Sequence, residues 1–135
     1  MNQQQYTRHQ KMVREFHRLV GAYVGEWPHV PVARIRALRI RLISEELEEF
    51  RIASENNDIV GVADALADLL VVVNGAALAW GINIGPIFDE VHRSNMTKRD
   101  GLIRSDGKIL KGPSYSPPNL EPLLEAQIPG EGSIF

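Results

Sequence analysis

Six carboxylates in the middle of this 135-residue chain have the spacing of a metal site. Four of them, Glu45, Glu46, Glu48 and Glu49, lie in the segment SEELEEF at residues 44–50. On a helix, side chains three and four residues apart share a face, so Glu45 and Glu46 both lie beside Glu49, whereas Glu48 points elsewhere. Like charges at this spacing repel one another unless a cation or a basic partner lies between them. The segment therefore indicates either a metal site or an ion-paired surface.

Asp64 and Asp68 form a second acidic pair, and they lie in the most apolar stretch of the chain, residues 59–82. We expect this stretch to be a buried helix, where an unpaired carboxylate costs far more free energy than at the surface. No Lys or Arg lies between Ile52 and Val91, so a partner for these acids has to come from another helix or from a metal ion. This second pair favours the metal site.

Oxygen ligands are those that Mg²⁺ prefers, with Mn²⁺ as a possible substitute. Ions held between two acidic helix turns can neutralise a polyphosphate and acidify a water molecule, and a spare carboxylate can take the proton of that water. The chemistry predicted is hydrolysis of a phosphoanhydride. The alternative for the glutamates alone is a solvated helix face paired to Arg39, Arg41 or Arg51.

Length and charge point to one soluble domain over residues 1–135. A net charge of −2 and a pI near 6.1 give no sign of a nucleic-acid or membrane surface. The chain contains no cysteine, and its polar start, MNQQQ, lacks the apolar core of a signal peptide, so we expect a cytoplasmic protein. The apolar run at 59–82 is long enough to span a membrane, but its acids argue against that.

Apolar periodicity predicts an all-α fold, a four-helix bundle with helices at about 3–23, 32–54, 59–80 and 86–97. Asp58 is the expected N-cap of the third helix, and Gly81 is expected to end it. Residues 102–110, around Asp106-Gly107, predict a small β-hairpin, and the proline-containing tail from about 112 is expected to be extended. The third helix is apolar on nearly all sides, which predicts a dimer or a dimer of dimers. Trp27 and Trp80 are interpreted as packing residues.

Over residues 16–120 the chain resembles the MazG-like all-α nucleoside triphosphate pyrophosphohydrolases, which include dimeric dUTPases and phosphoribosyl-ATP pyrophosphohydrolase. The segments EVHRSNMTK at 90–98 and DGKILKGPSYSPP at 106–118 carry the most specific part of the resemblance. It implies that Glu46, Glu49 and Asp68 bind Mg²⁺ and that Glu45 orients or deprotonates water.

The chain departs from that family at one ligand position. The family's Glu three residues before Asp68 is Ala65 here, and Asp64 lies one position earlier. We expect Asp64 to serve as the fourth ligand from this neighbouring position, directly or through a water molecule.

Five further residues are candidate substrate contacts. Lys98 and Lys111 are the natural phosphate contacts, because an acidic site needs local cations to admit a polyanion, although each could be an ordinary surface charge. Asn95 either caps its helix or binds sugar or phosphate. His17 could contact a base but is interpreted as structural, and Tyr115 is expected to cover the site.

The function expected is Mg²⁺-dependent hydrolysis of a (deoxy)nucleoside triphosphate to the monophosphate and pyrophosphate by a homodimer or homotetramer, with a dUTP-like nucleotide as a candidate substrate. Two alternatives remain open. One is a helical module that binds nucleotide or protein without turnover, suggested by Ala65, and the other is phosphoribosyl-ATP hydrolysis.

Overall fold

The computed structural model of the chain describes residues 5–130, and these form a mostly helical structure. The helices are α1 (Arg8–Val20), α2 (Ala33–Glu55), α3 (Ile59–Ala79), α4 (Ile84–Met96) and the short α5 (Glu121–Glu125). The all-α prediction is confirmed, and the four longer helices overlap the predicted ranges. Helix α1 is shorter than the predicted range of 3–23, of which residues 3 and 4 lie outside the described residues. Helix α5 was not predicted, because the prolines of the tail indicated extended chain.

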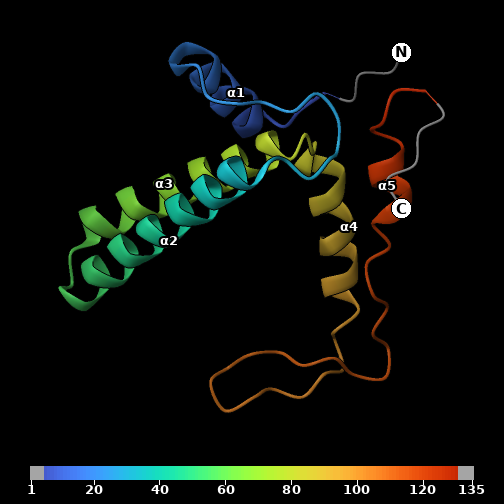
Figure 1. Cartoon of the computed structure of the whole chain (residues 1–135). Helices are drawn as coiled ribbons and strands as arrows, with labels where there is room; N and C mark the ends of the chain where they lie inside the picture. Colours follow the sequence, from blue (N-terminus) through green and yellow to red (C-terminus); the bar gives the residue numbers. More distant parts are fainter. Residues whose placement is uncertain (1–4, 131–135) are drawn as a thin grey trace.

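The two longest helices form an antiparallel hairpin that is the central element of the fold (Figure 1). The turn between them is short, and the side chain of Asp58 accepts a hydrogen bond from the N–H of Gly61 at 3.0 Å. Asp58 therefore caps α3 as its sequence position predicted, because a carboxylate satisfies an N–H that the first helical turn leaves unpaired. This hairpin sets the acidic segment of α2 opposite the acids of α3.

A buried glutamine fastens α1 to the turn between α3 and α4. The side chain of Gln10 is fully buried, and its Nε2 donates to the carbonyl of Ile82 at 2.6 Å. Its Oε1 accepts from the N–H of Ile84 at 3.0 Å, so both ends of the amide are paired. Because a buried amide is costly unless satisfied, these two bonds fix where α1 crosses α3.

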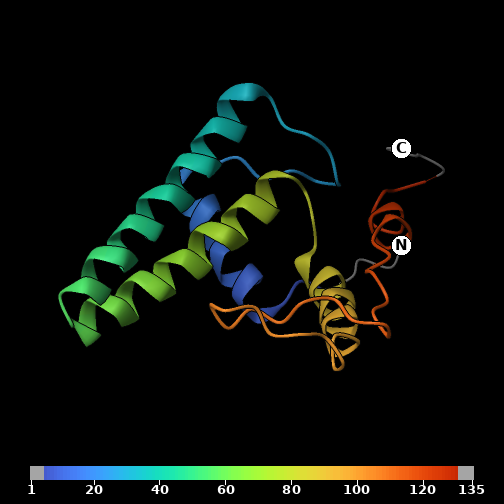
Figure 2. The same cartoon turned by 90° about the horizontal axis from the view of Figure 1, so that it is seen from below.

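The connection from α1 to α2 lies on the C-terminal end of α3. The N–H of Gly25 donates to the carbonyl of Leu78 at 2.8 Å, and the N–H of His29 donates to the carbonyl of Trp80 at 3.0 Å. In Figures 1 and 2 this connection, blue to cyan, arches from α1 to the start of α2 past the end of α3. Carbonyls at a helix end have no partner within the helix, so these bonds supply them.

Three details of the predicted architecture are not found in full in the single chain. Helix α4 does not complete a closed four-helix bundle within one chain; it stands to one side of the α2–α3 hairpin in both views (Figures 1 and 2). The expected hairpin is reduced to a single antiparallel bridge between Ile103 and Ile109 across the predicted turn, with no strand in the described part of the chain. The side chain of Trp27 is 45% exposed, so it does not pack in the core of the single chain.

The helix predicted to be buried is largely exposed in the single chain. Asp64 is exposed and Asp68 is half-buried, whereas Ala65 between them is buried. The buried core within residues 5–130 consists mainly of small side chains, with Leu78 the only large apolar one that is fully buried. The sequence pattern predicted an apolar environment for this helix, and one chain does not supply it.

Helix α3 is also the one described helix that by length and composition could cross a membrane. Such a helix is weak evidence, because the core helix of a soluble protein has the same length and composition. Asp64 and Asp68 lie within it, and a charged side chain at bilayer depth is costly.

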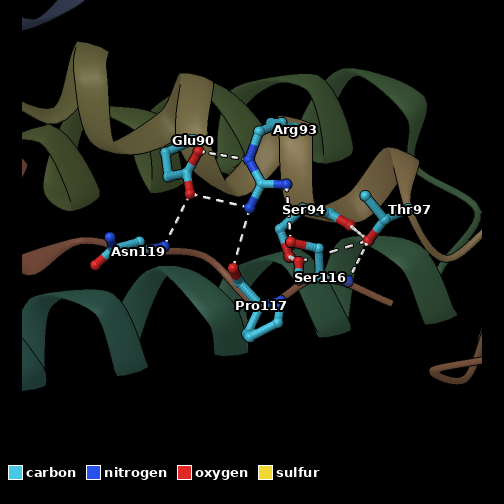
Figure 3. A network of polar contacts seen from close by, with 7 residues as sticks. All are labelled: Glu90, Arg93, Ser94, Thr97, Ser116, Pro117 and Asn119. Carbon is cyan, nitrogen blue, oxygen red and sulfur yellow. Dashed lines mark hydrogen bonds and ion pairs between the residues drawn. The ribbon is translucent and has the colours of Figure 1, made fainter. Parts of the chain in front are cut away.

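The tail is held against α4 by a network of polar contacts (Figure 3). Arg93 donates from Nη1 to the hydroxyl of Ser116 at 3.1 Å and from Nη2 to the carbonyl of Pro117 at 3.0 Å. Glu90 pairs with Arg93 and accepts from the N–H of Asn119 at 2.8 Å. These two interactions, Arg93 first, lower the pKa of Glu90 to about 2. The residues of the EVHRSNMTK segment that form this network therefore hold the tail in place.

Replacing Arg93 by Met should detach residues 116–119 from α4, because the guanidinium makes both the ion pair and the bonds to the tail. Hydrogen exchange at the amide of Asn119 should become several-fold faster. Arg99→Met is the control, since Arg99 is exposed and outside the network. Unchanged exchange in Arg93→Met would show that the tail is held by other contacts.

The lowered pKa of Glu90 also predicts how the network depends on pH. The contribution of Glu90 to stability is present above the usual glutamate range and is lost only as the pH falls through about 2.

Candidate active site

Three carboxylates from the two central helices converge on one point. Glu46 and Glu49 come from α2 and Asp68 from α3, and one oxygen of each lies within 4.8 Å of the others. Glu46 and Asp68 are half-buried, whereas Glu49 is exposed. The antiparallel pairing of α2 and α3 creates this group, because it places the middle of one helix opposite the middle of the other.

The group has the properties of a cation site. Glu46 Oε2 is buried and has no hydrogen-bond donor within residues 5–130. Burial, followed by a hydrogen bond with Glu49 and the negative charges of Glu49, Asp68 and Asp64, raises the pKa of Glu46. A divalent cation would supply the missing partner and offset this repulsion. The residues present therefore fit a divalent metal, held by Glu46, Glu49 and Asp68.

Asp64 and Glu45 lie outside this group of three. Asp64 is exposed one turn before Asp68, although its charge still acts on Glu46. Glu45 is also exposed, and its Oε1 lies 3.9 Å from Nε of Arg41. A shallow depression of about 480 Å³ is lined by Glu45 together with Arg41, Ser44, Glu48 and Glu49, so it meets the metal group at Glu49. Glu45 thus lies where a water next to the group is accessible to it.

The predicted ion-paired surface accounts for two glutamates of the segment, Glu45 with Arg41 and Glu48 with Arg51. Glu48 forms an ion pair with Arg51, which also binds Glu55 at 2.7 Å, and all three are exposed. The hydrogen bond from Arg51 lowers the pKa of Glu48. The acidic segment therefore has two faces, an ordinary surface face at Glu48 and the convergent group at Glu46 and Glu49.

The predicted substrate contacts are not gathered at the acidic group within one chain. Asn95 is exposed and Lys98 half-buried at the end of α4, and Nζ of Lys111 lies 5.0 Å from the ring centre of half-buried Tyr115. Figure 1 shows helix α4 and the segment after it apart from the middle of the α2–α3 hairpin. His17 is buried, in agreement with its structural interpretation.

One charged residue near the site was misread from the sequence. Arg39 was considered only as a surface partner of the glutamates, yet it is 6% exposed and contacts His17, with Nη1 3.4 Å from Nε2. A side chain on Gly75 would come within 3.0 Å of both, so the glycine makes room for them. The position of Arg39 in the sequence could have indicated its burial. It lies four residues after the apolar Ile35 and seven before Glu46, which puts all three on the inner face of α2.

Helices that present convergent carboxylates to a common point are a recognised class of all-α metal sites. Within this class the family is defined by sequence: residues 13–95, more than half of the chain, match the family model of phosphoribosyl-ATP pyrophosphohydrolase. The chain belongs to that family, which is part of the MazG-like all-α superfamily, and the predicted resemblance is confirmed. The protein is therefore a pyrophosphohydrolase, a hydrolase of phosphoanhydride bonds. A comparison with curated proteins found no match.

Metal affinity should fall as the pH is lowered, and the decrease should begin above the usual glutamate range. The reason is that a proton competes with the metal for Glu46, whose pKa is raised in the metal-free protein. Calorimetric titration with Mn²⁺ between pH 7 and pH 5 measures this. Asp64→Asn removes one repelling charge, so the onset should move to lower pH. Affinity independent of pH over this range would contradict carboxylate binding.

The raised pKa of Glu46 affects the stability of the metal-free protein in the opposite direction to its effect on metal affinity: lower pH favours the metal-free fold and weakens metal binding. A carboxyl group whose pKa is raised on folding stabilises the metal-free protein below its unfolded pKa, and this contribution is lost as the pH rises through the folded value. Metal should therefore stabilise the protein most at neutral pH, where the group is ionised and repulsion is greatest.

Proposed function

We propose that the protein catalyses Mg²⁺-dependent hydrolysis of a (deoxy)nucleoside triphosphate, with a dUTP-like nucleotide as a candidate substrate, to the nucleoside monophosphate and pyrophosphate. The carboxylate group of Glu46, Glu49 and Asp68 is the observation that carries the proposal. In this reaction an oxygen of water bonds to the α-phosphorus, the bond to the bridging oxygen breaks, and pyrophosphate leaves. Membership of the family supplies the class of reaction, and the substrate is the proposed part.

The acidic side chains of α2 and α3 have separate roles in the proposed reaction. Glu46, Glu49 and Asp68 hold the metal, with Asp64 as the outlying fourth acid. When bound, Mg²⁺ neutralises the polyphosphate and acidifies water. Glu45, exposed beside Glu49, orients the attacking water and takes its proton. Mn²⁺ substitutes for Mg²⁺ because both accept oxygen ligands.

A second copy of the chain completes the proposed enzyme as a homodimer or homotetramer. Large apolar side chains of α3 are exposed in the single chain, among them Leu66, Leu70, Val71 and Val73. A monomeric soluble protein rarely leaves so continuous an apolar face uncovered, and a second α2–α3 hairpin of the same chemistry fits it. Such packing would bury Asp64 and Asp68 and bring α4 of one copy toward the acids of another. Asn95, Lys98, Lys111 and Tyr115 then contact substrate across the interface, with His17 supporting the site from α1.

Phosphoribosyl-ATP is the second candidate substrate, because the matching family model bears that name. The match ends at residue 95, so the segment with Lys98, Lys111 and Tyr115 lies outside it. The resemblance of that segment to the other branch of the superfamily is what favours a nucleoside triphosphate. The absence of a glutamate at Ala65 leaves a non-catalytic module of the same fold as the weakest alternative. We place the protein in the cytoplasm, acting on free nucleotides and bound to neither nucleic acid nor membrane.

Pyrophosphate release from a panel of deoxynucleoside triphosphates and phosphoribosyl-ATP, with Mg²⁺ and with EDTA, tests the proposal. Metal-dependent release from a deoxynucleotide is the expected result. Release from phosphoribosyl-ATP alone would replace the first substrate by the second, and metal-independent nucleotide binding without product would favour the non-catalytic module. Sedimentation of the same preparation without detergent tests assembly; a monomer would contradict the proposed homodimer.

A further inference from the structure

The α1–α2 connection and the start of α2 enclose an open cavity of about 560 Å³ that the proposed reaction does not use. Its volume is in the range of small-molecule sites. Apolar side chains, among them Val30, Val32, Ile35 and Leu38, form much of its wall. The charged lining residues are Arg34 and Arg39, and no acidic residue lines it. The cavity is therefore positively charged, in contrast to the acidic group further along α2.

Arg39 is the residue that most needs a ligand. It is 6% exposed, and its Nε has no hydrogen-bond partner among residues 5–130. No carboxylate of that part of the chain forms an ion pair with it, and Nη1 lies 3.4 Å from Nε2 of His17. Burial of a cation without an anion is strongly unfavourable, so an anion beside Arg39 would supply what the protein does not.

The backbone also favours an anion at this cavity. Val32, which lines it, is the N-cap residue of α2, and no side chain caps that helix. The free N–H groups and the positive end of the helix dipole are therefore available at the cavity. Arg36 donates to the carbonyl of Pro31 at 2.7 Å, which holds the connection against the start of α2.

The remaining polar wall is already ordered by hydrogen bonds. His29 Nδ1 must donate to the carbonyl of Trp27 at 2.8 Å, because a carbonyl can only accept. His29 Nε2 is hydrogen-bonded to the hydroxyl of Tyr23, also at 2.8 Å. The Tyr23 oxygen keeps a lone pair for a ligand hydroxyl group.

We propose that this cavity is a phosphate-binding subsite, in which Arg39, Arg34 and the N-terminus of α2 bind the phosphate of a small phosphorylated molecule such as a sugar phosphate. The apolar wall packs on the carbon skeleton, and the arginines bind the phosphate oxygens. Bidentate hydrogen bonds from a guanidinium suit a phosphate group.

The position of the subsite on α2 relates it to the acidic group. Arg39 and Glu46 are seven residues apart on the same face of α2, which is two turns or about 10 Å along the helix. On α3, Gly75 lies opposite Arg39 and Asp68 lies opposite Glu46. Both sites therefore lie along the contact between α2 and α3. Phosphoribosyl-ATP carries a phosphate on its second ribose besides its triphosphate, so one molecule could occupy both sites. This assignment rests on the proposed function; binding of a separate sugar phosphate does not.

Calorimetry with ribose 5-phosphate and with inorganic phosphate, in EDTA, tests the subsite without the metal or the reaction. Both should bind to the wild-type protein, and affinity should fall at least tenfold in Arg34→Gln and in Arg39→Met. Arg8→Gln is the matched control, because Arg8 is an exposed arginine that does not line the cavity. Arg34 is exposed, so its variant stays informative if Arg39→Met fails to fold. Absence of binding at millimolar concentration, or equal affinity in wild type and Arg34→Gln, would overturn the proposal.

The kinetics of Arg34→Gln then identify the source of the phosphate. A KM raised for phosphoribosyl-ATP and unchanged for dUTP assigns the subsite to the second phosphate of the substrate. Loss of ribose 5-phosphate binding with both KM values unchanged assigns it to a separate phosphorylated molecule. Either result supports the subsite, and neither depends on which nucleotide is the better substrate.

Discussion

Replacing Glu49 by Gln will lower metal-dependent pyrophosphate release at least about 100-fold, because the change removes one of three convergent oxygen ligands and its charge. Asp68→Asn will have an effect of similar size from the opposite helix. Both substitutions keep the shape of the side chain, so the helices should remain intact. Calorimetry with Mn²⁺ on the same variants should show weaker binding, which separates loss of metal from loss of a general base.

Glu48→Gln is the matched control. Glu48 is a neighbouring glutamate of the same helix, but it is exposed and paired with Arg51 rather than with the metal group. Its activity should stay close to wild type. Full activity in Glu49→Gln, or an equal loss in Glu48→Gln, would show that the acidic segment acts through its overall charge and not through a site.

The local structure of the central hairpin was accessible from sequence because local rules govern it. Asp58 caps α3 and Gly81 follows its end, as the preferences of helix termini indicate. Three- and four-residue spacing also put Glu46 and Glu49 on one face and Glu48 on another, which the structure reproduces.

Features that depend on contacts between distant segments were not accessible in the same way. The periodicity of α3 indicated burial but not what buries it, so Asp64 appeared buried when it is exposed in the single chain. The sequence does not distinguish Arg39 from the other arginines of α2, whereas the structure shows that Arg39 lies against His17 and Gly75. The segment at 102–110 contains a turn signal, but only one bridge forms, because a turn alone does not pair strands.

Replacing Gly81 by Ala will destabilise the protein by at least about 3 kcal/mol, which combines backbone strain with a steric clash. Gly81 has φ +69°, a conformation that favours glycine. A Cβ there would lie 2.0 Å from the carbonyl oxygen of Trp27. The connection cannot move away freely, because Gly25 and His29 are hydrogen-bonded to the end of α3. Thermal unfolding should therefore occur roughly 10 °C lower.

Gly21→Ala separates the two causes. Gly21 follows α1 as Gly81 follows α3, and its φ of +74° is nearly the same, yet a Cβ there meets nothing within 4 Å. Its substitution should cost only the backbone strain, about 1 kcal/mol. The difference between the two variants thus measures how firmly the α1–α2 connection is held on α3. Equal destabilisation would mean that this connection yields easily, and the cavity beside Arg39, which it encloses, would then lack a fixed wall.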